Sequence, residues 1–200
     1  MTWTVRRARG SAADFHARDL AAERAVWVFD VERPTVVLGS RQPLRDLHDV
    51  DVDVVQRRSG GGAVYLEPGR ALWIDVVVPR ADELWDDDVG RAAYWLGEAW
   101  AAALGAGALV HRGPMVSNEW SDVVCFAGLG PGEVTVGGRK AVGISQRRTR
   151  EAARFQCVAY ERWEPHPLVD LLEVHAELGA VGVGVGALPT VEASLLDQFS

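Results

Sequence analysis

Three consecutive glycines stand in the stretch Gln56-Arg57-Arg58-Ser59-Gly60-Gly61-Gly62-Ala63-Val64-Tyr65, between two segments that are typical of β-strands. Glycine has no Cβ atom, so the backbone can approach a ligand closely and present its N–H groups to an anion. The arginine upstream supplies a planar cation that suits phosphate or carboxylate. No Lys-Ser/Thr pair follows, which excludes a Walker loop, and the spacing excludes a dinucleotide fingerprint. The stretch therefore predicts an anion-binding loop, or more plainly a flexible hairpin loop beside a surface arginine.

The segments around this loop predict an α+β fold with a mostly antiparallel or mixed β-sheet flanked by helices. A two-residue turn at Gly137-Gly138 predicts a hairpin. The alternation of 72–78 indicates a strand buried on one face. Strands are predicted at 26–31, 35–38, 52–56, 63–66, 72–78, 123–126, 133–136, 139–145 and 154–160. Helices are predicted at 11–23, where Ser11 is the N-cap, and at 89–104, 168–173 and 191–199.

The bulk properties favour one domain over 1–200 in the cytoplasm. The chain has 200 residues, 48% of them hydrophobic, which is enough for one core and too few for two ordinary domains. It lacks a predicted signal peptide, and it lacks an apolar run long enough for a membrane span. The two cysteines, Cys125 and Cys157, form no CxxC pair. A net charge of -7 argues against a nucleic-acid partner.

Lys140 is the only lysine among the 21 Lys and Arg residues. It lies just after the predicted hairpin turn, in the segment Gly138-Arg139-Lys140-Ala141-Val142-Gly143. Lysine is a compact point charge, whereas arginine is a planar fork. This position can therefore require the compact charge of lysine, which arginine does not supply. A lysine held rigidly there could stabilise negative charge on a phosphate or an acyl oxygen. The plainer interpretation is an ordinary exposed hairpin.

Together, these segments resemble the catalytic domain of the lipoate/biotin–protein ligase family. Its lipoate branch carries a pattern like R-x-S-G-G-G-A-V-Y-H-D followed by G-R/K-K-hydrophobic-x-G-S-A-Q, to which Arg57–Glu67 and Gly138–Gln146 are similar. The stretch Thr35-Val36-Val37-Leu38-Gly39-Ser40-Arg41-Gln42 is similar to the T-V-V-I-G-x-x-Q strand and loop of the family. The three matches follow the family's order and cover most of the chain.

The resemblance implies a class II synthetase-like fold and an enzyme that activates lipoate or octanoate with ATP and Mg²⁺. The acyl group would pass from an acyl-adenylate to a lysine of a lipoyl carrier domain, of the 2-oxoacid dehydrogenase E2 or glycine cleavage H protein type. Lys140 would hold the α-phosphate and acyl carbonyl oxygens. The substrate and ATP site would include Arg57, Ser59, Gly60, Gly61, Gly62, Ala63, Val64, Tyr65, Lys140 and Gly143.

A second interpretation rests on Cys125-Phe126, which is similar to a C-F pair ahead of the G-R-K motif in cysteine-dependent octanoyltransferases. There a thiolate takes the acyl group from a carrier protein without ATP. A cation such as Lys140 beside the thiol would favour the thiolate, the nucleophilic form. Against this, that group usually reads G-G-R where this chain has Gly60-Gly61-Gly62. The apolar run at 123–126 favours an inner strand with Cys125 as a small buried hydrophobe.

Three positions depart from the family pattern: Leu66 replaces a histidine, Cys157 replaces the histidine of a Phe-x-His pair, and Ile144 replaces a small residue. These changes would reshape the acyl pocket. They motivate a third interpretation, a non-catalytic homologue that binds a lipoyl or acyl group. An accessory subunit is a further possible partner, because the ligase branch often needs an accessory domain. The scattered histidines show no metal-ligand spacing, so no metal-binding residue is predicted: His16, His48, His111, His166 and His175.

Overall fold

The computed structural model describes residues 2–44, 51–174 and 177–200, and a seven-stranded mixed sheet forms its centre. The strand order is β1-β2-β6-β10-β9-β8-β7, in which β1 and β2 are parallel and every other neighbouring pair is antiparallel. These strands are β1 (Thr4–Gly10), β2 (Ala25–Val31), β6 (Ala71–Pro79), β7 (Ala108–Val110), β8 (Val134–Val136), β9 (Arg139–Arg148) and β10 (Ala152–Tyr160).

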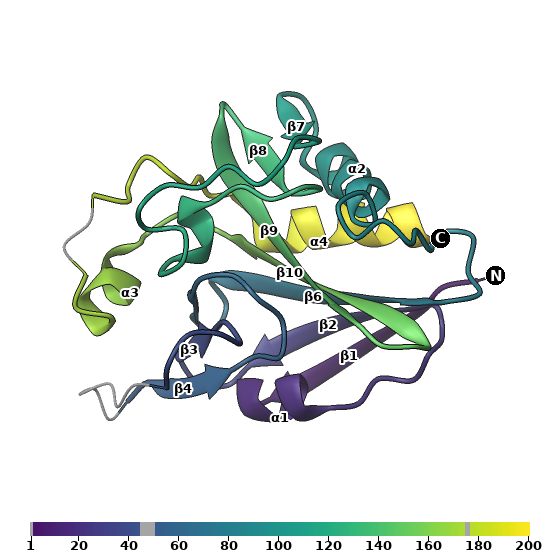
Figure 1. Cartoon of the computed structure of the whole chain (residues 1–200), viewed down its shortest axis with the longest axis horizontal. Helices are drawn as coiled ribbons and strands as arrows, with labels where there is room; N and C mark the ends of the chain where they lie inside the picture. Colours follow the sequence, from purple (N-terminus) through teal and green to yellow (C-terminus); the bar gives the residue numbers. More distant parts are fainter. Residues whose placement is uncertain (1, 45–50, 175–176) are drawn as a thin grey trace.

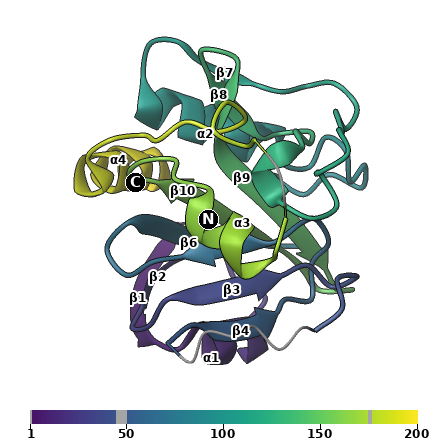
Figure 2. The ribbon, with the colours of Figure 1, turned by 90° about the vertical axis from the view of Figure 1, so that its left-hand side faces the viewer.

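A three-stranded sheet and four α-helices cover the two faces of this large sheet. The small sheet has the order β4-β3-β5, with β4 (Asp53–Gln56), β3 (Thr35–Leu38) and β5 (Val64–Leu66). The helices are α1 (Ala12–Ala17), α2 (Tyr94–Leu104), α3 (His166–Leu171) and α4 (Leu188–Leu196), with short 3-10 helices η1 (Cys125–Ala127) and η2 (Asp197–Phe199). Figure 1 shows α2 and α4 on one side of the large sheet, and α1 with the small sheet on the other. Figure 2 shows the same layers after a quarter turn.

Strand β6 is buried on both faces, whereas its alternation predicted burial on one. On one face Ile74 and Val76 pack in a core with Leu96 and Trp100 of α2. On the other face Trp73 packs in a second core with α1 and the small sheet. The prediction of a half-buried strand is wrong because the second layer comes from distant segments that β6 itself does not reveal.

The predicted fold class is confirmed, and the strands that were missed are short or exposed. Ser11 does cap α1, accepting a hydrogen bond from Asp14 N at 3.1 Å, but the helix ends at Ala17. Strand β1 was missed because it is an exposed edge strand rich in arginine, and β7 was missed because it has only 3 residues.

The predicted strand at 123–126 is wrong. Val124 forms one isolated bridge with Ala63, and the chain then turns into η1. Of the histidines considered above, His48 and His175 lie outside the described residues. None of the helices among the described residues combines the length and apolar character that a bilayer crossing requires.

Candidate active site

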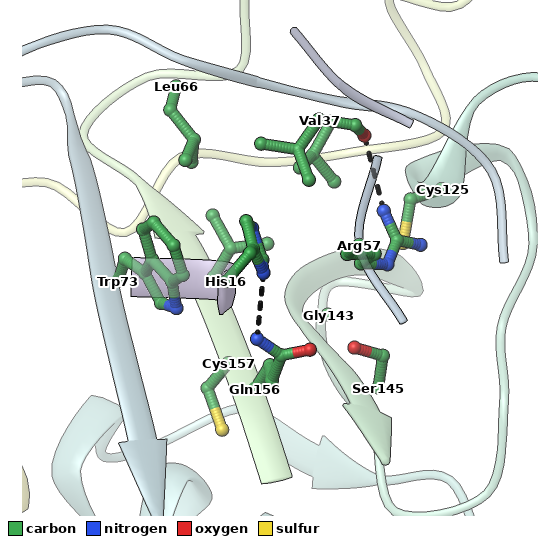
Figure 3. A pocket seen from close by; sticks show the side chains of 12 residues that line it. His16, Val37, Arg57, Leu66, Trp73, Cys125, Gly143, Ser145, Gln156 and Cys157 are labelled. Carbon is green, nitrogen blue, oxygen red and sulfur yellow. Dashed lines mark hydrogen bonds between the residues drawn. The ribbon is translucent and has the colours of Figure 1, made fainter. Parts of the chain in front are cut away.

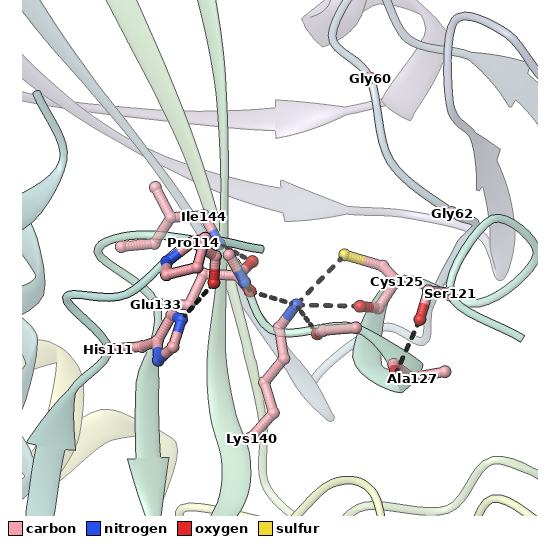
Figure 4. A network of polar contacts seen from close by, with 12 residues as sticks. Gly60, Gly62, His111, Pro114, Ser121, Cys125, Ala127, Glu133, Lys140 and Ile144 are labelled. Carbon is pink, nitrogen blue, oxygen red and sulfur yellow. Dashed lines mark hydrogen bonds and ion pairs between the residues drawn. The ribbon is translucent and has the colours of Figure 1, made fainter. Parts of the chain in front are cut away.

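Lys140 lies at the centre of a buried polar cluster with Glu133 and Cys125 (Figure 4). Its Nζ is 2.7 Å from Glu133 Oε2 and donates to the carbonyl oxygens of Cys125 at 2.9 Å and Gly128 at 3.0 Å. The same Nζ is 3.7 Å from Cys125 Sγ. Both charged side chains are almost inaccessible, 3% exposed for Lys140 and 6% for Glu133. The cluster therefore pairs a cation with one carboxylate and one thiol.

The backbone holds Lys140 firmly in place at the start of β9. Its amide donates to Val181 O at 3.0 Å, and its carbonyl accepts from Val183 N at 2.9 Å. Burial by itself lowers the pKa of the Lys140 ammonium, but electrostatic interactions and hydrogen bonds with Cys125 and Glu133 outweigh burial and raise the pKa above its usual value. Lys140 is thus a fixed positive charge at neutral pH.

Glu133 is held by backbone groups as well as by Lys140. Its Oε2 accepts from Gly130 N at 2.6 Å, and its Oε1 accepts from Ile144 N at 3.0 Å. A carboxylate with two N–H donors and an ammonium is well satisfied despite its burial. Glu133 therefore neutralises Lys140 in part and fixes the direction of its side chain.

Cys125 begins η1, and its backbone is pinned against the glycine loop. Cys125 N donates to Ala63 O at 2.9 Å, while Ala63 N donates to Val123 O at 2.8 Å. A Cβ atom on Gly62 would lie 2.6 Å from the carbonyl carbon of Val124 and 2.7 Å from Cys125 N. The third glycine is therefore required for the loop to pack directly behind the thiol, a reason different from the predicted anion contact.

Arg57 holds the glycine loop from inside. Its guanidinium donates to Val37 O at 3.2 Å, Gly60 O at 2.7 Å and Gly62 O at 2.9 Å. Its Nε has no hydrogen-bond partner among the residues that the structure describes. Burial lowers the pKa of Arg57, although arginine keeps its charge at neutral pH. The predicted anion-binding fork is thus largely occupied by backbone carbonyls, and one donor is left over.

Two hollows meet at Cys125. The larger is an open cleft of about 1310 Å³, counting the space open to solvent, and it runs past the glycine loop, Lys140 and Glu133. The smaller is a pocket of about 380 Å³ on the same basis, with mostly apolar walls (Figure 3). The pocket is lined by His16, Val37, Arg57, Val64, Leu66, Trp73, Cys125, Gly143, Ser145, Gln156, Cys157 and Val158. The thiol therefore lies where a chain held in the pocket would meet a partner in the cleft.

Strand register builds one side of this pocket. Gln156 of β10 lies between Ser145 of β9 and Asp75 of β6, so these three polar residues form a row across the sheet. Ser59 Oγ of the glycine loop lies 3.0 Å from Ser145 Oγ and donates to Gln156 Oε1 at 3.0 Å. The loop is thereby tied to the sheet, and a polar edge is built into an otherwise apolar pocket.

A second buried ion pair, Arg154–Asp75, fixes α1 over the pocket. Arg154 Nε donates to Asp75 Oδ2 at 2.5 Å, and its two Nη atoms donate to Phe15 O at 2.8 Å and Arg18 O at 3.1 Å. Burial raises the pKa of Asp75, while Arg154 and hydrogen bonds from Trp73 and Gln156 oppose that rise. The ion pair thus clamps the end of α1, which carries His16, onto the sheet.

The structure brings together part of the predicted site. Lys140 and Gly60, Gly61 and Gly62 line the cleft, Arg57, Val64 and Gly143 line the pocket, and Cys125 lines both. Ser59 is buried and tied to the pocket side through Gln156. Ala63 is fully buried, and Tyr65 lines a separate hollow with Tyr160 and Trp163, so these two are not brought to either wall.

Cys125 corrects one expectation. The apolar run favoured a buried strand position, yet the side chain is partly exposed in both hollows. The other thiol, Cys157, is fully enclosed, and burial raises its pKa well above the usual range. Cys125 is thus the accessible thiol of the pair, and Cys157 is a wall residue.

Sequence reasoning missed Glu133, His16, Asp75, Arg154 and Gln156. None of them belongs to a motif considered above, and all except Glu133, whose partner Lys140 is close by in the chain, acquire their role from a partner distant in sequence. A signal was present for Asp75, an isolated carboxylate within an otherwise apolar strand, which had to find a buried cation. The described residues contain no cluster of three or more His, Cys, Asp or Glu side chains that could hold a metal ion.

Comparison with known proteins gives one family match and one curated relative. The family model of the lipoyl protein ligase A/B catalytic domain matches residues 14–183. The chain is 31% identical over 179 residues to an octanoyl-[GcvH]:protein N-octanoyltransferase of Geobacillus kaustophilus. That alignment covers 82% of this chain and 59% of the relative, so the chain spans less than two thirds of the relative's length.

Solved structures share the fold at low sequence identity. A lipoate-protein ligase A bound with ATP is 18% identical, with a TM-score of 0.71 over 100% of this chain and 85% of the other. A candidate lipoate protein ligase of T. acidophilum with bound lipoic acid is 18% identical, with a TM-score of 0.72 and the same coverage. These similarities show the fold.

Proposed function

Because the chain belongs to the lipoyl protein ligase A/B catalytic domain family, we propose that it transfers an octanoyl or lipoyl group to a lysine of a lipoyl carrier domain through a thioester on Cys125. The observation that carries this proposal is the position of the Cys125 thiol, which lies between the apolar pocket and the open cleft with Lys140 Nζ at 3.7 Å. This order of preference reverses that of the sequence analysis, in which the adenylate route came first.

The proposed reaction has two transfer steps. Cys125 Sγ attacks the acyl carbonyl of a donor, a C–S bond forms, the bond between the acyl carbon and the donor's leaving atom breaks, and that atom takes the thiol proton. The amine of the acceptor lysine then attacks the thioester carbonyl, a C–N bond forms, the C–S bond breaks, and the proton of the amine returns to the thiol. Neither step consumes ATP. The acyl chain lies in the apolar pocket while both carrier domains approach from the cleft.

Lys140 supplies the charge that this chemistry requires. Its ammonium Nζ lies 3.7 Å from Cys125 Sγ, close enough to interact with charge on the sulfur while the sulfur attacks. It also places positive charge near the acyl oxygen, on which negative charge develops during each attack, and this requires no direct hydrogen bond from Nζ to that oxygen. Arg57 Nε, which has no partner among the described residues, is a second donor available beside Cys125 (Figure 3). Pre-arranged donors of this kind stabilise a transition state without reorganising.

The second candidate is the ATP-dependent ligase, in which Lys140 holds the α-phosphate of an acyl-adenylate. The large cleft beside Gly60, Gly61 and Gly62 favours it, because glycine backbone can approach a phosphate closely. The surroundings of Lys140 oppose it. Three protein oxygens lie within 3.0 Å of Nζ and match its three donor hydrogens, and the nearest belongs to a carboxylate that would repel a phosphate.

The decisive experiment is intact-mass analysis of the protein after incubation with an octanoyl or lipoyl thioester. We expect one added acyl group, removable by hydroxylamine, that is then lost when an apo carrier domain is supplied. Cys125→Ser should prevent both the adduct and the transfer. Cys157→Ser is the matched control, because that thiol is enclosed, and this variant should still form the adduct.

The alternatives give different results in the same series. Transfer that survives in Cys125→Ser, together with acid-dependent exchange of labelled pyrophosphate into ATP, would replace the thioester route with the ligase. Binding of the acyl group without an adduct, exchange or transfer would indicate a non-catalytic homologue.

A further inference from the structure

His16 lines the apolar pocket and carries a side-chain nitrogen that no described protein group pairs with. The side chain is 8% exposed and lines the pocket from α1. Its Nε2 is buried and has no hydrogen-bond partner within the described ranges of the chain. A buried polar atom without a partner is unfavourable, so such an atom at the wall of a ligand pocket points to a partner on the ligand.

The neighbours of His16 decide which nitrogen carries the hydrogen. Gln156 Nε2 lies 3.2 Å from His16 Nδ1, while Gln156 Oε1 accepts from Ser59. Gln156 also stabilises the charged form of Asp75 through a side-chain hydrogen bond, which requires its NH₂ group to face that side. The NH₂ group therefore donates to Nδ1, and the proton of the neutral ring resides on Nε2.

The ring is neutral and held rigidly. Burial lowers the pKa of His16 to about 3, with further lowering by Arg154 and Arg57. The imidazole stacks on Trp73, with ring centroids 4.6 Å apart and an interplanar angle of 29°. The Arg154–Asp75 pair clamps the helix that carries it. A donor with a fixed direction and fixed protonation is what selective recognition requires.

Figure 3 shows His16 and Trp73 on one side of the pocket and Cys125 and Arg57 on the other. An acyl chain bound to Cys125 Sγ and extending into the pocket would place its carbonyl beside Arg57 and its distal carbons beside His16. Leu66 lines the same pocket with an alkyl side chain that offers no polar atom. Among these residues, His16 is thus the neutral donor available to the far part of the chain.

We propose that His16 is a specificity-determining residue whose Nε2–H donates a hydrogen bond to an acceptor atom in the distal half of the acyl chain. The preferred acyl group would carry an oxygen or a sulfur there. Oxygen is a strong acceptor, disulfide or thioether sulfur is a weak one, and an unsubstituted alkyl tail offers none. This inference rests on the proposed acyl-transfer function, for which it names the class of acyl group.

The test is equilibrium binding of free acids, measured by calorimetry, and it does not depend on transfer. The ligands are octanoates with a ketone at the sixth or the seventh carbon, each compared with the acid that has a methyl branch at the same carbon. The two members of a pair are similar in size, and only the ketone carries an acceptor. At one of the two positions the wild-type protein should bind the ketone about tenfold more tightly.

Two variants separate recognition from folding. His16→Phe keeps a ring that can stack on Trp73 but removes the donor, so the preference for the ketone should disappear. His16→Gln keeps an N–H group at a similar reach and should retain most of the preference. The wild type should also bind lipoate more tightly than octanoate, by a smaller factor than it prefers the ketone. This difference in affinity should also be lost in His16→Phe.

Equal binding of the two members of each pair by the wild type would overturn the inference, as would a preference that persists in His16→Phe. A wild type that binds none of these acids would overturn it as well, because the pocket would not take this class of ligand. A ketone preference in a protein that transfers no acyl group would leave this inference in place and contradict the proposed function alone.

Discussion

Two buried ion pairs flank the pocket, and they differ in what surrounds them. On the hairpin wall, formed by Cys125, Glu133 and Lys140, the ion pair borders an open cleft and has a thiol beside it. The helix wall is formed by His16, Asp75 and Arg154. There the Asp75 carboxylate is completely enclosed, and Arg154 also donates hydrogen bonds to the carbonyls of Phe15 and Arg18.

The difference shows how one kind of interaction serves two purposes. Protein groups satisfy the hydrogen bonds of both pairs, and the helix-wall pair fixes the shape of the pocket. The hairpin-wall pair holds a positive charge beside a partly exposed sulfur, where charge changes during the proposed reaction. Breaking the first pair should therefore change mainly stability, and breaking the second should change mainly the rate of acyl transfer.

The largest expected effect is on stability, from Asp75→Asn. This change leaves Arg154 charged, buried and without its carboxylate, which costs about 3–5 kcal/mol of unfolding free energy. Denaturant unfolding measures it. The matched control is Asp53→Asn, whose partner Arg33 is 54% exposed, and this change should cost less than about 1 kcal/mol. If the two variants lose the same unfolding free energy, the structural role assigned to the helix wall is wrong.

Lys140→Met should lower the rate of acyl transfer about 10²–10³-fold, because it removes the positive charge beside the attacking sulfur and the acyl oxygen. Steady-state transfer to a carrier domain measures this loss, and Arg139→Met, at the exposed neighbouring position, is the control. Adding Glu133→Gln to Lys140→Met removes the orphaned carboxylate. If the folded double variant transfers the acyl group at the wild-type rate, the role proposed for the Lys140 ammonium is contradicted.

The pH dependence of stability should distinguish the helix wall from the hairpin wall. The pKa of His16 is about 3 in the folded protein and 6.5 in its ordinary state. Below pH 6.5 the unfolded chain therefore binds a proton that the folded chain does not. Stability should fall towards pH 3 by up to about 1.4 kcal/mol per pH unit from this group. Unfolding free energies of the wild type and His16→Phe, measured at several pH values between 7 and 4, isolate this contribution. If the two free energies change with pH in the same way, the imidazole is not buried and neutral.

The smallest effect concerns the packing behind the thiol. Gly62→Ala places a methyl group against the backbone of Val124 and Cys125, which should cost about 1–3 kcal/mol and slow transfer as Cys125 shifts. Gly60→Ala is the control in the same loop, since its Cβ would meet nothing within 4 Å. Thermal unfolding and transfer rates of the two variants test this. Equal stability and equal transfer rates of the two variants would show that the loop can shift to admit the methyl group.

Much of the fold could be predicted from the sequence, because the strands of the core have strong local patterns. The bounds predicted for 35–38 agree with β3, and the Gly137-Gly138 turn joins β8 to β9 as expected. The class of fold and the family resemblance are confirmed. The polar edge strand β1 and the turn at Cys125 were not predictable in this way. Strand β1 lacks the alternation of a half-buried strand, and the apolar run at 123–126 has the pattern of a strand and not of a turn.

The sequence by itself determined the family, the glycine loop, the singular lysine and the candidate thiol, because each is a local pattern of residue types. Only the tertiary structure decided that Lys140 faces Glu133 and Cys125, and that His16 faces the pocket. The physical reason is that burial and hydrogen-bond pairing are set by neighbours in space. Gln156 and His16 are 140 residues apart in the chain, and their contact depends on the register that places Gln156 and on the packing of α1 against the sheet. Long-range register follows from packing of the whole fold, and no local stretch encodes it.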